Sequence, residues 1–490
     1  MNDSAKLVES TPPTKPIEVV EQTLYEIRKK IYPRAVTGKF ATARWSFVLL
    51  TQLVFYGTPW LTWNARQAVL FDLASRKFYI FGLVFWPQDI VYLTALLIIC
   101  AYSLFLFTAV AGRLWCGYAC PQTVYTELFM WIERHIEGDR MARMKLDAKP
   151  IGARKIWLKT VKHGIWIALG LWTGFTFVGY FTPIKTLWQE TFSAGLGPWE
   201  GFWILFYGFA TYGNAGWMRE QVCKYMCPYA RFQGVMFDPD TLVITYDRER
   251  GDPRGSRSRG VDHKAKGLGD CVDCDICVQV CPTGIDIRSG LQYECIGCGA
   301  CIDGCNQVMD KMGYPKGLIR YSTENALSKH YPTERIARRM FRPRVLIYGG
   351  ILLVVVVVAL ATLYNRVPVK VDVILDRANT LREGDDPVVE NIYRLQIMNT
   401  DETPREFSIS VSGLKEMKLV SETQPIRLTG ASNRMVPVRV RVEREYAVKG
   451  SNRIEFTIEA REAGRAGVSE PLVIREKASF VVQTEAPHHD

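Results

Sequence analysis

Long stretches without charged residues alternate with highly charged ones along the chain. Five runs contain no Asp, Glu, Lys or Arg, and they cover residues 45–65, 90–112, 163–184, 201–218 and 345–365. A helix needs about 20 apolar residues to cross the hydrocarbon core of a bilayer. The pattern therefore predicts five transmembrane helices. A shorter uncharged run, Phe78 to Gln88, is expected to be interfacial or re-entrant.

The last part of the chain shows a different pattern, in which apolar and polar positions alternate. The alternation is clear in Val367–Ile374, Tyr393–Ile397, Phe407–Val411 and Val436–Val442. Alternation with a period of two is typical of half-buried β-strands. Residues 366–490 are therefore expected to form an all-β immunoglobulin-like sandwich, here without a cysteine pair. Since this part has no catalytic constellation, we expect it to bind or position a partner.

The charge of the chain follows the same division. The net charge is +11, which would suit a nucleic-acid-binding protein. Lys and Arg are concentrated in 1–44, 113–162 and 219–344, whereas the short loops 66–89 and 185–200 hold few. Cationic loops stay in the cytoplasm. The charge therefore predicts a cytoplasmic N-terminus and an outer C-terminus, and no nucleic-acid partner is expected.

These patterns together predict a multi-domain membrane protein, with the lipid bilayer as its first partner. Its parts are a cytoplasmic N-terminal segment (1–44), four transmembrane helices (45–228), a cytoplasmic linker with a cysteine-rich module (229–344), a fifth transmembrane helix (345–365) and the outer β domain (366–490). All of the 13 cysteines except Cys100, which is expected to be an ordinary buried thiol, lie in the segments assigned to the cytoplasm. Thiolate metal sites belong on that reducing side of the membrane.

Eight cysteines repeat one spacing twice. The first motif contains Cys271, Cys274, Cys277 and Cys281, and the second contains Cys295, Cys298, Cys301 and Cys305. Both read C-x2-C-x2-C-x3-C, the pattern of bacterial ferredoxins with two 4Fe–4S clusters. In that pattern the fourth cysteine of each motif binds the other cluster. Structural zinc is the alternative. A zinc site, however, uses four ligands, commonly two C-x2-C pairs, whereas here eight cysteines follow the ferredoxin spacing.

The ferredoxin spacing therefore predicts an α+β module that binds two 4Fe–4S clusters. The first cluster is assigned Cys271, Cys274, Cys277 and Cys305. The second cluster is assigned Cys295, Cys298, Cys301 and Cys281.

Four further cysteines form a second type of motif. Cys116 and Cys120 precede Pro121, and Cys223 and Cys227 precede Pro228. Both units read C-x-Y-x-C-P, and each closes a pair of uncharged runs, so the two halves of 45–228 are expected to be an internal repeat. A spacing of four residues places both thiols of a unit on one face of a helix. If the two units pack together, the four thiols could hold a copper ion or a further iron–sulfur cluster.

Other redox motifs are absent from the sequence. It contains no C-x2-C-H motif for a covalently bound haem, and no G-x-G-x-x-G motif after a strand for a nicotinamide or flavin domain. We therefore expect an iron–sulfur electron carrier that receives its electrons from an external donor, which the sequence does not name.

Taken together, the chain resembles the FixG/RdxA family of bacterial cytochrome c oxidase accessory proteins, also known as the CcoG family. The resemblance rests on the two C-x3-C-P units, the double ferredoxin motif, the five uncharged runs, the cysteine-free β tail and the segment Tyr32–Phe40 before the first run. It implies an inner-membrane protein with a periplasmic C-terminus. It also implies an oxidoreductase that reduces Cu(II) to Cu(I) during assembly of a cbb3-type cytochrome oxidase, with that oxidase or its assembly factors as partners.

Two other functions stay open from the sequence. The C-x3-C-P units are similar to those of membrane polyferredoxins that oxidise quinols, and an assembly scaffold without its own turnover is the other alternative. For the copper reductase, we expect Cys116, Cys120, Cys223 and Cys227 to form the redox site, because soft thiolates favour Cu(I) over Cu(II).

Overall fold

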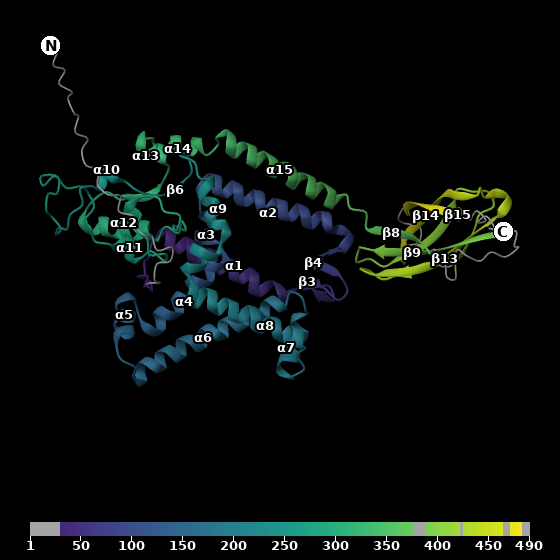
Figure 1. The fold of residues 1–490 in the computed structure, drawn as a ribbon, viewed down its shortest axis with the longest axis horizontal. Helices are drawn as coiled ribbons and strands as arrows, with labels where there is room; N and C mark the ends of the chain where they lie inside the picture. The colour runs from purple at the N-terminus through teal and green to yellow at the C-terminus, as the bar shows by residue number, and fades with distance from the viewer. Residues whose placement is uncertain (1–29, 377–387, 422–424, 464–470, 483–490) are drawn as a thin grey trace, which may run out of the picture.

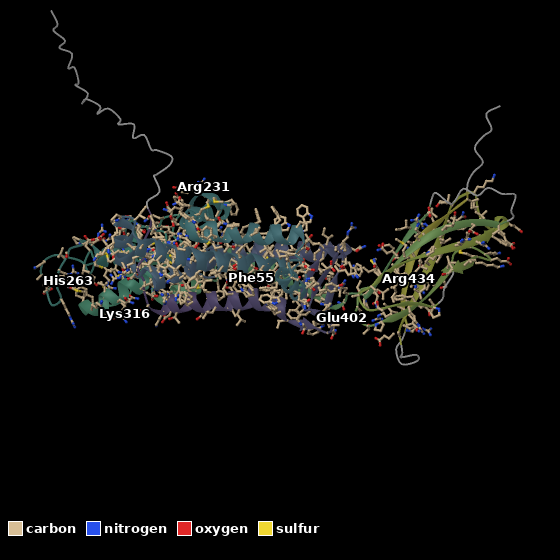
Figure 2. The ribbon with its side chains drawn as sticks, turned by 90° about the horizontal axis from the view of Figure 1, so that it is seen from below. Phe55, Arg231, His263, Lys316, Glu402 and Arg434 are labelled. Carbon is tan, nitrogen blue, oxygen red and sulfur yellow. The ribbon has the colours of Figure 1, made fainter. Side chains whose placement is uncertain are left out.

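The computed structural model describes residues 30–376, 388–421, 425–463 and 471–482. Three parts follow one another along its long axis (Figure 1): a module around α11 and α12, a group of long helices, and a β-sandwich at the C-terminal end. In the second view, His263 and Lys316 lie at the first of these ends and Arg434 lies in the sandwich (Figure 2). Most of the segment expected to be the cytoplasmic N-terminus, residues 1–29, lies outside the described residues.

Five long helices occupy the positions of the uncharged runs. They are α1 (Lys39–Gly57), α2 (Ile90–Ala111), α6 (Ala153–Val178), α8 (Pro198–Thr211) and α15 (Pro343–Tyr364). α15 packs on α2, and α6 packs closely on α8. A Cβ atom at Gly174 in α6 would lie 2.2 Å from the carbonyl oxygen of Ile204 in α8. Small residues therefore bring these two backbones together, which is typical of helices packed within a membrane.

Two helices in the described part of the chain are long and apolar enough to cross a membrane: Pro87–Ala111 and Pro343–Tyr364. The prediction of five transmembrane helices is therefore not confirmed. α1 ends at Gly57 because Pro59 and a short sheet follow it, and charged residues occupy the start of α6. α8 has only 14 residues before the chain continues as a π-helix, η3 (Tyr212–Met218). Cys100 lies exposed on α2, so the expectation of a buried thiol is wrong.

A small β region follows α1. It contains a two-stranded sheet of β1 (Thr62–Trp63) and β2 (Arg66–Gln67), and a three-stranded sheet of β3 (Val69–Asp72), β4 (Lys77–Ile80) and β5 (Leu83–Phe85). The run from Phe78 to Gln88 contributes to β4 and forms β5; its expected interfacial or re-entrant position stays a prediction. Buried Asp89 accepts a hydrogen bond of 2.6 Å from Arg366 and pairs with Lys370. This contact joins the start of α2 to the chain that enters the sandwich.

Shorter elements make up the remaining α regions. They are α3 (Leu114–Tyr118), α4 (Pro121–Glu137), α5 (Arg140–Ala148), α7 (Ile184–Phe192), a second π-helix η4 (Val222–Met226), α9 (Pro228–Met236), α10 (Arg248–Gly251), α13 (Glu324–Ser328) and α14 (Thr333–Arg339); short 3₁₀ turns are η1 (Thr58–Trp60), η2 (Pro87–Asp89), η5 (Ile287–Ser289) and η6 (Arg444–Tyr446).

The cysteine-rich module has an α+β core. Its two strands, β6 (Val243–Tyr246) and β7 (Ile319–Ser322), pair antiparallel, and Val243 lies opposite Ser322. The helices α11 (Ile276–Gln279) and α12 (Ala300–Met312) pack on each other. Six of the eight ferredoxin cysteines are buried in or packed against the same apolar core, so the cysteine sites and the core of the module are one unit.

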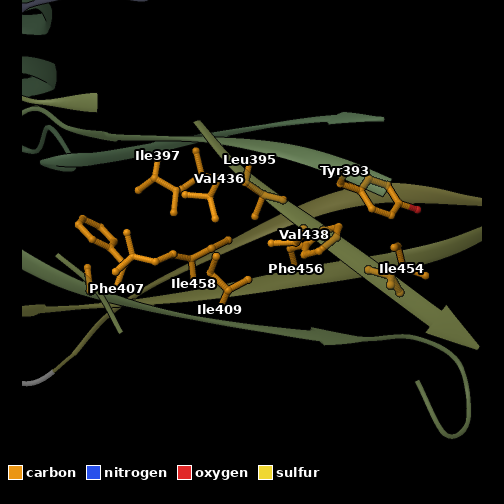
Figure 3. Close-up of a cluster of buried hydrophobic side chains, with 14 of the residues drawn as sticks. Tyr393, Leu395, Ile397, Phe407, Ile409, Val436, Val438, Ile454, Phe456 and Ile458 are labelled. Carbon is orange, nitrogen blue, oxygen red and sulfur yellow. The ribbon is translucent and has the colours of Figure 1, made fainter. Parts of the chain in front are cut away.

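The C-terminal part is a sandwich of two four-stranded antiparallel sheets. One sheet has the order β12-β10-β14-β15 and the other β11-β13-β9-β8. The strands are β8 (Val369–Leu375), β9 (Val388–Asn399), β10 (Arg405–Ser412), β11 (Lys418–Ser421), β12 (Ile426–Leu428), β13 (Asn433–Glu443), β14 (Gly450–Glu462) and β15 (Leu472–Val482). Alternate residues of both sheets, such as Leu395 and Phe456, point into a common core (Figure 3). The alternation in the sequence predicted this layered architecture.

Candidate metal centres

The first set of cysteines converges as the ferredoxin spacing predicts. Cys271 and Cys274 come from the loop that leads into α11, Cys277 lies in α11, and Cys305 comes from α12. All four line one small cavity. Burial raises the pKa of Cys277 to about 12, and burial likewise raises the pKa of Cys305 to about 12. Without a cation these thiols would stay protonated, so the site has the chemistry of a metal centre whose ion draws off the protons.

The second set lies next to the first. Cys281, Cys295, Cys298 and Cys301 line a second small cavity, and Cys277 of the first set borders it as well. Burial raises the pKa of Cys295 to about 12, against the opposing effect of a backbone N–H of Gly297. Gly297 and Gly299 adopt left-handed φ angles of 65° and 73°. This conformation, natural to glycine, turns backbone N–H groups toward the sulfur ligands.

The eight thiols therefore fit two 4Fe–4S clusters. Among the described residues, no group of three or more Cys, His, Asp and Glu side chains is placed to hold a single metal ion. A cubane cluster has four irons and each thiolate binds a different one, so its ligands stand further apart than those of one ion. When bound, each cluster would accept and donate one electron at a time.

The two C-x3-C-P units have a different backbone from the one that we expected. Cys116 lies in α3, whereas Cys120 has an extended conformation and precedes the first turn of α4. Cys223 lies in the π-helix η4, and Cys227 precedes α9 in the same way. The prediction of two thiols on one helical face is therefore wrong. Proline cannot continue a helix but is favoured in the first turn of a new one.

This geometry places the second thiol of each unit at the N-terminus of a helix. There the unpaired backbone N–H groups and the helix dipole favour a thiolate. Burial raises the pKa of Cys120, but backbone N–H groups of Gln122 and Thr123 act in the opposite direction. Both units share this arrangement, which agrees with the internal repeat expected from the sequence.

The two units also face each other. The charge of Cys120 and that of Cys227 act on both Cys116 and Cys223, and burial raises the pKa of Cys116 to about 12 and that of Cys223 to about 11. The Sγ atom of Cys116 donates a hydrogen bond of 3.3 Å to Gln233 in α9. The packing of the repeat thus gathers four thiols, which we name the thiol centre: Cys116, Cys120, Cys223 and Cys227.

The thiol centre lies directly against the second cluster site. A Cβ atom at Gly117 would lie 2.8 Å from the carbonyl oxygen of Gly297 and 3.0 Å from the Cα atom of Cys298. Only glycine allows this approach between the first C-x3-C-P unit and the second ferredoxin loop. A narrow cavity at Cys223 is also lined by Thr283 and Ile296, and these two residues line the cavity of the second cluster as well.

Buried cations, which the sequence analysis did not assign to the sites, accompany this row of centres. Arg113 is 4% exposed, and its charge favours the thiolate forms of Cys116, Cys223 and Cys295. Arg44 acts in the same way on Cys298. At the other end, Arg288 forms ion pairs of 2.7 Å with Asp273 and Asp275 of the first cysteine loop. The position of Arg113, three residues before Cys116, was the only signal in the sequence.

Comparison with known proteins supports the class that this fold and these sites define, an iron–sulfur protein of the two-cluster ferredoxin type with an immunoglobulin-like C-terminal domain. A family model described as a 4Fe–4S dicluster domain matches residues 218–324, and a 4Fe–4S binding domain matches residues 93–137. The immunoglobulin-like fold at the C-terminus of FixG matches residues 359–483. The predictions of 4Fe–4S sites and of an immunoglobulin-like tail are therefore confirmed.

Curated relatives identify the family. The nitrogen fixation protein FixG of Rhizobium meliloti is 40% identical over 81% of this chain and 81% of its own. Protein RdxA of Cereibacter sphaeroides is 40% identical over 80% of this chain and 84% of its own, and RdxB of the same organism is 38% identical over 82% and 86%. The chain belongs to the FixG/RdxA family, as the resemblance predicted.

Proposed function

We propose that this protein is a membrane-bound cupric reductase that uses its iron–sulfur clusters to reduce Cu(II) to Cu(I). Binding of the copper ion would draw the thiols of the thiol centre together, because in the described structure they are not close enough to hold one ion, and the adjacent second cluster would supply the electron. We propose further that the Cu(I) is destined for assembly of a cbb3-type cytochrome oxidase. The observation that carries the proposal is the contact of Gly117 with Gly297 and Cys298, because it places the thiol centre beside a one-electron carrier.

The chemistry of the four thiols supports copper as the substrate. Thiolates are soft ligands, and they bind Cu(I) in preference to Cu(II). A Cu(II) ion held there would therefore be easier to reduce than in water, and the transfer of one electron completes the reaction. At Cys120, the backbone N–H groups of Gln122 and Thr123 favour the thiolate form.

The location is part of the proposal. We propose that α1, α2, α6, α8 and α15 cross the bacterial inner membrane, with the ferredoxin module in the cytoplasm and the sandwich in the periplasm. The outward side chains of α1 and α8 are apolar, among them Leu53 and Phe209. A group of arginines just before and at the start of α15, including Arg339, Arg342 and Arg344, pairs with Asp238 and Asp240. Such a cationic border is typical of the cytoplasmic end of a span.

The test compares single cysteine variants of the purified protein. Cys116→Ser, Cys120→Ser, Cys223→Ser and Cys227→Ser should each lose Cu(I) production, measured with a Cu(I)-specific chelator, while both cluster signals persist in paramagnetic resonance. The matched control is Cys100→Ser, which removes an exposed thiol on α2 that lies outside the thiol centre. Wild-type copper reduction in the four variants would contradict the proposal.

A further inference from the structure

A cavity of about 370 Å³ lies near the thiol centre, since Arg219 and Glu220 line both this cavity and the narrow cavity at Cys223. It lies between the end of α4, the first part of α6, the π-helix η3 and Lys30 near the start of the described chain. Its walls include Glu133, Lys162, His163, Trp166 and Trp217. We name it the donor cavity. No copper or cluster chemistry assigned above uses it.

The irregular backbone of one wall sets this cavity apart. The chain leaves α8 as the π-helix η3, turns at Arg219 with a left-handed φ of 43°, and continues into the second π-helix η4, which holds Cys223. π-helices and positive φ angles at residues other than glycine are rare and gather at functional sites. The same strained segment therefore builds the wall of the donor cavity and one half of the thiol centre.

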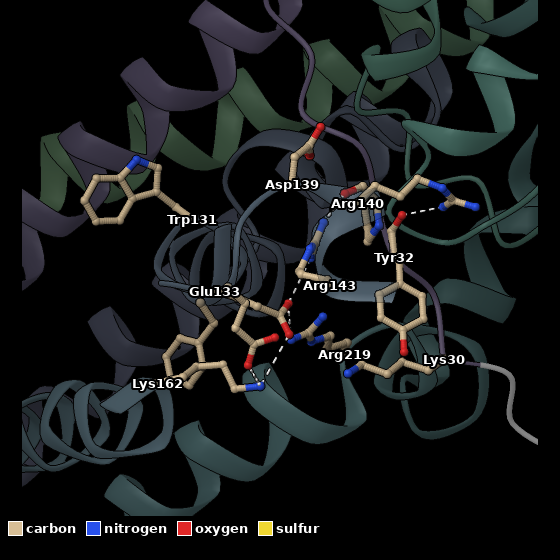
Figure 4. Close-up of polar contacts among 12 residues, drawn as sticks. Lys30, Tyr32, Trp131, Glu133, Asp139, Arg140, Arg143, Lys162 and Arg219 are labelled. Carbon is tan, nitrogen blue, oxygen red and sulfur yellow. Dashed lines mark hydrogen bonds and ion pairs between the residues drawn. The ribbon is translucent and has the colours of Figure 1, made fainter. Parts of the chain in front are cut away.

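The charged groups of the cavity are matched with one another. Glu133 is 1% exposed and lies among Arg143, Lys162 and Arg219 (Figure 4), and these two arginines approach it to 3.0 Å. Burial alone would raise the pKa of Glu133, but the neighbouring cations outweigh it and lower that pKa to about 2. The carboxylate therefore stays ionised.

The remaining cations of the wall are also paired. Lys159 and Lys162 lie 2.9 Å and 2.8 Å from Glu137, and Lys30 lies 2.6 Å from Asp147. Since each cation of the described wall already has a carboxylate, these residues offer no unpaired positive charge for a phosphate group. A neutral ligand fits these walls better than an anionic one.

The uncharged part of the wall is aromatic. The ring of His163 stacks on Trp217, with centroids 5.7 Å apart at 20°, and meets Trp166 edge-on at 5.1 Å. Trp166 is 2% exposed, whereas Trp217 is 53% exposed, so one tryptophan is at the back of the cavity and the other faces outward. Such walls bind a flat ring by stacking.

The depth of the cavity in the proposed membrane restricts the class of ligand further. The charged start of α6 ends at Lys162, and its uncharged run begins at His163; both residues line the cavity. The donor cavity therefore lies at the boundary between the proposed bilayer and the cytoplasm. A ligand that dissolves in the bilayer and carries polar groups on a ring reaches this position directly.

We propose that the donor cavity binds a membrane hydroquinone, which supplies the electrons for the reaction proposed above. Arg219 and Glu220 border both the donor cavity and the narrow cavity at Cys223. Thr283 and Ile296 lie between that narrow cavity and the cavity of the second cluster. The first cluster follows, since Cys277 lines both cluster cavities. The donor cavity, the thiol centre, the second cluster site and the first cluster site are thus neighbours in this order. This inference rests on the proposed function, because it identifies the electron donor of the proposed copper reduction.

The electrons and protons of this step balance. Oxidation of a hydroquinone to a quinone breaks two O–H bonds and releases two protons and two electrons. When bound, the two 4Fe–4S clusters would take up one electron each and would supply these electrons to two Cu(II) ions. The first proton goes to Nε2 of His163, whose Nδ1 lies 3.0 Å from the Tyr212 hydroxyl, and the second goes to water. Glu133 takes up neither proton, because its three cations keep it a carboxylate.

The test uses the full-length protein in lipid nanodiscs and a short-tailed ubiquinone that carries a photoreactive azido group. Labelling should map to peptides with Trp166 or Trp217, and affinity for the unlabelled quinone should fall at least tenfold in Trp217→Ala. The matched control is Trp199→Ala, an exposed tryptophan on α8 that lies outside the cavity and should bind as the wild type does. Binding does not depend on loaded clusters.

Several outcomes would overturn the inference. Labelling at other helices, equal quinone affinity in Trp217→Ala and the wild type, or tight binding of flavin mononucleotide instead of the quinone would each reject the hydroquinone site. A second variant, His163→Phe, keeps a ring at the cavity but lacks the proton acceptor. It should keep quinone binding while reduction of the clusters by the hydroquinone slows at least tenfold; an unchanged rate would reject the proton step.

A separate arm tests the proposed function without the donor. Clusters are reduced with dithionite, the excess is removed by gel filtration, and Cu(II) is added in a single turnover. Trp217→Ala should reduce copper in this assay as the wild type does. If the wild type itself fails here, the copper reductase is rejected while quinone binding can still be scored. If only quinone binding fails, the donor site is rejected and the reductase stands.

Discussion

The two ferredoxin motifs and the two C-x3-C-P units use the same ligand atom in opposite ways. All eight ferredoxin thiols come from one segment between Cys271 and Cys305, and six of them lie in or against the apolar core of a single module. The thiol centre takes its halves from Cys116–Cys120 and Cys223–Cys227, which come together only through the packing of the helical repeat. A local motif thus forms a site for a resident cofactor. A site built from distant segments depends on tertiary contacts, and it lies open to a cavity.

The largest effect that separates the two regions should come from a cluster ligand. Cys301 is buried and belongs to the second cluster set. Cys301→Ser should remove about half of the bound iron and acid-labile sulfide, because a cubane cluster needs its four thiolates. Chemical analysis of anaerobically purified protein measures this loss. The paired variant Cys227→Ser should retain the iron of both clusters; equal iron loss in both variants would erase the distinction between the regions.

In the helical repeat, the largest loss of stability should come from a substitution of Glu133. Glu133→Gln leaves Arg143 and Arg219 buried without their carboxylate, whereas Lys162 keeps its ion pair with Glu137. Breaking a buried pair in this way costs about 3–5 kcal/mol. Thermal unfolding of the helical part, followed by tryptophan fluorescence, should shift to lower temperature while cluster absorbance is kept at room temperature. Glu390→Gln, at a carboxylate on the sandwich, should leave that transition unchanged; a Glu133→Gln transition at the wild-type temperature would contradict the prediction.

A substitution at the contact between the two regions should have the next largest effect. Gly117→Ala places a Cβ atom within 3.0 Å of three backbone atoms of the second ferredoxin loop. Overpacking of this kind costs about 1–3 kcal/mol. The resonance signal of the second cluster should change, and copper reduction should slow. Gly164→Ala is the control, since nothing lies within 4 Å of a Cβ atom there; identical spectra for both variants would show that the contact is absent in solution.

The smallest effect should come from the cation that the two regions share. Arg113→Gln removes a buried positive charge near Cys116, Cys223 and Cys295. The second cluster should become harder to reduce, with a midpoint potential lower by roughly 60 mV, which is tenfold in equilibrium for one electron. Redox titration measures this shift. Arg113→Lys should keep most of the midpoint potential, because it keeps the positive charge. A shift in the potential of the first cluster alone would contradict the prediction that Arg113 acts on the second cluster.

Several features were readable from the chain because they depend on local order. The ferredoxin spacing predicted the two crossed sets that the structure brings together, and the alternation after Val367 predicted the sandwich. The uncharged runs predicted long helices, but not where they end. Pro59 stops α1 early, and α8 passes into a π-helix whose longer turn no periodicity of 3.6 residues reveals.

The sequence by itself determined the ligand sets, the sandwich and the family, since spacing and alternation act over a few residues at a time. Only the tertiary structure decided that four thiols from two repeats meet, that Gly117 brings them against the second cluster, and that Arg113 lies among them. It also formed the donor cavity, whose walls come from segments as far apart as Lys30 and Glu220. Close packing between distant helices sets such distances, and no local pattern records them.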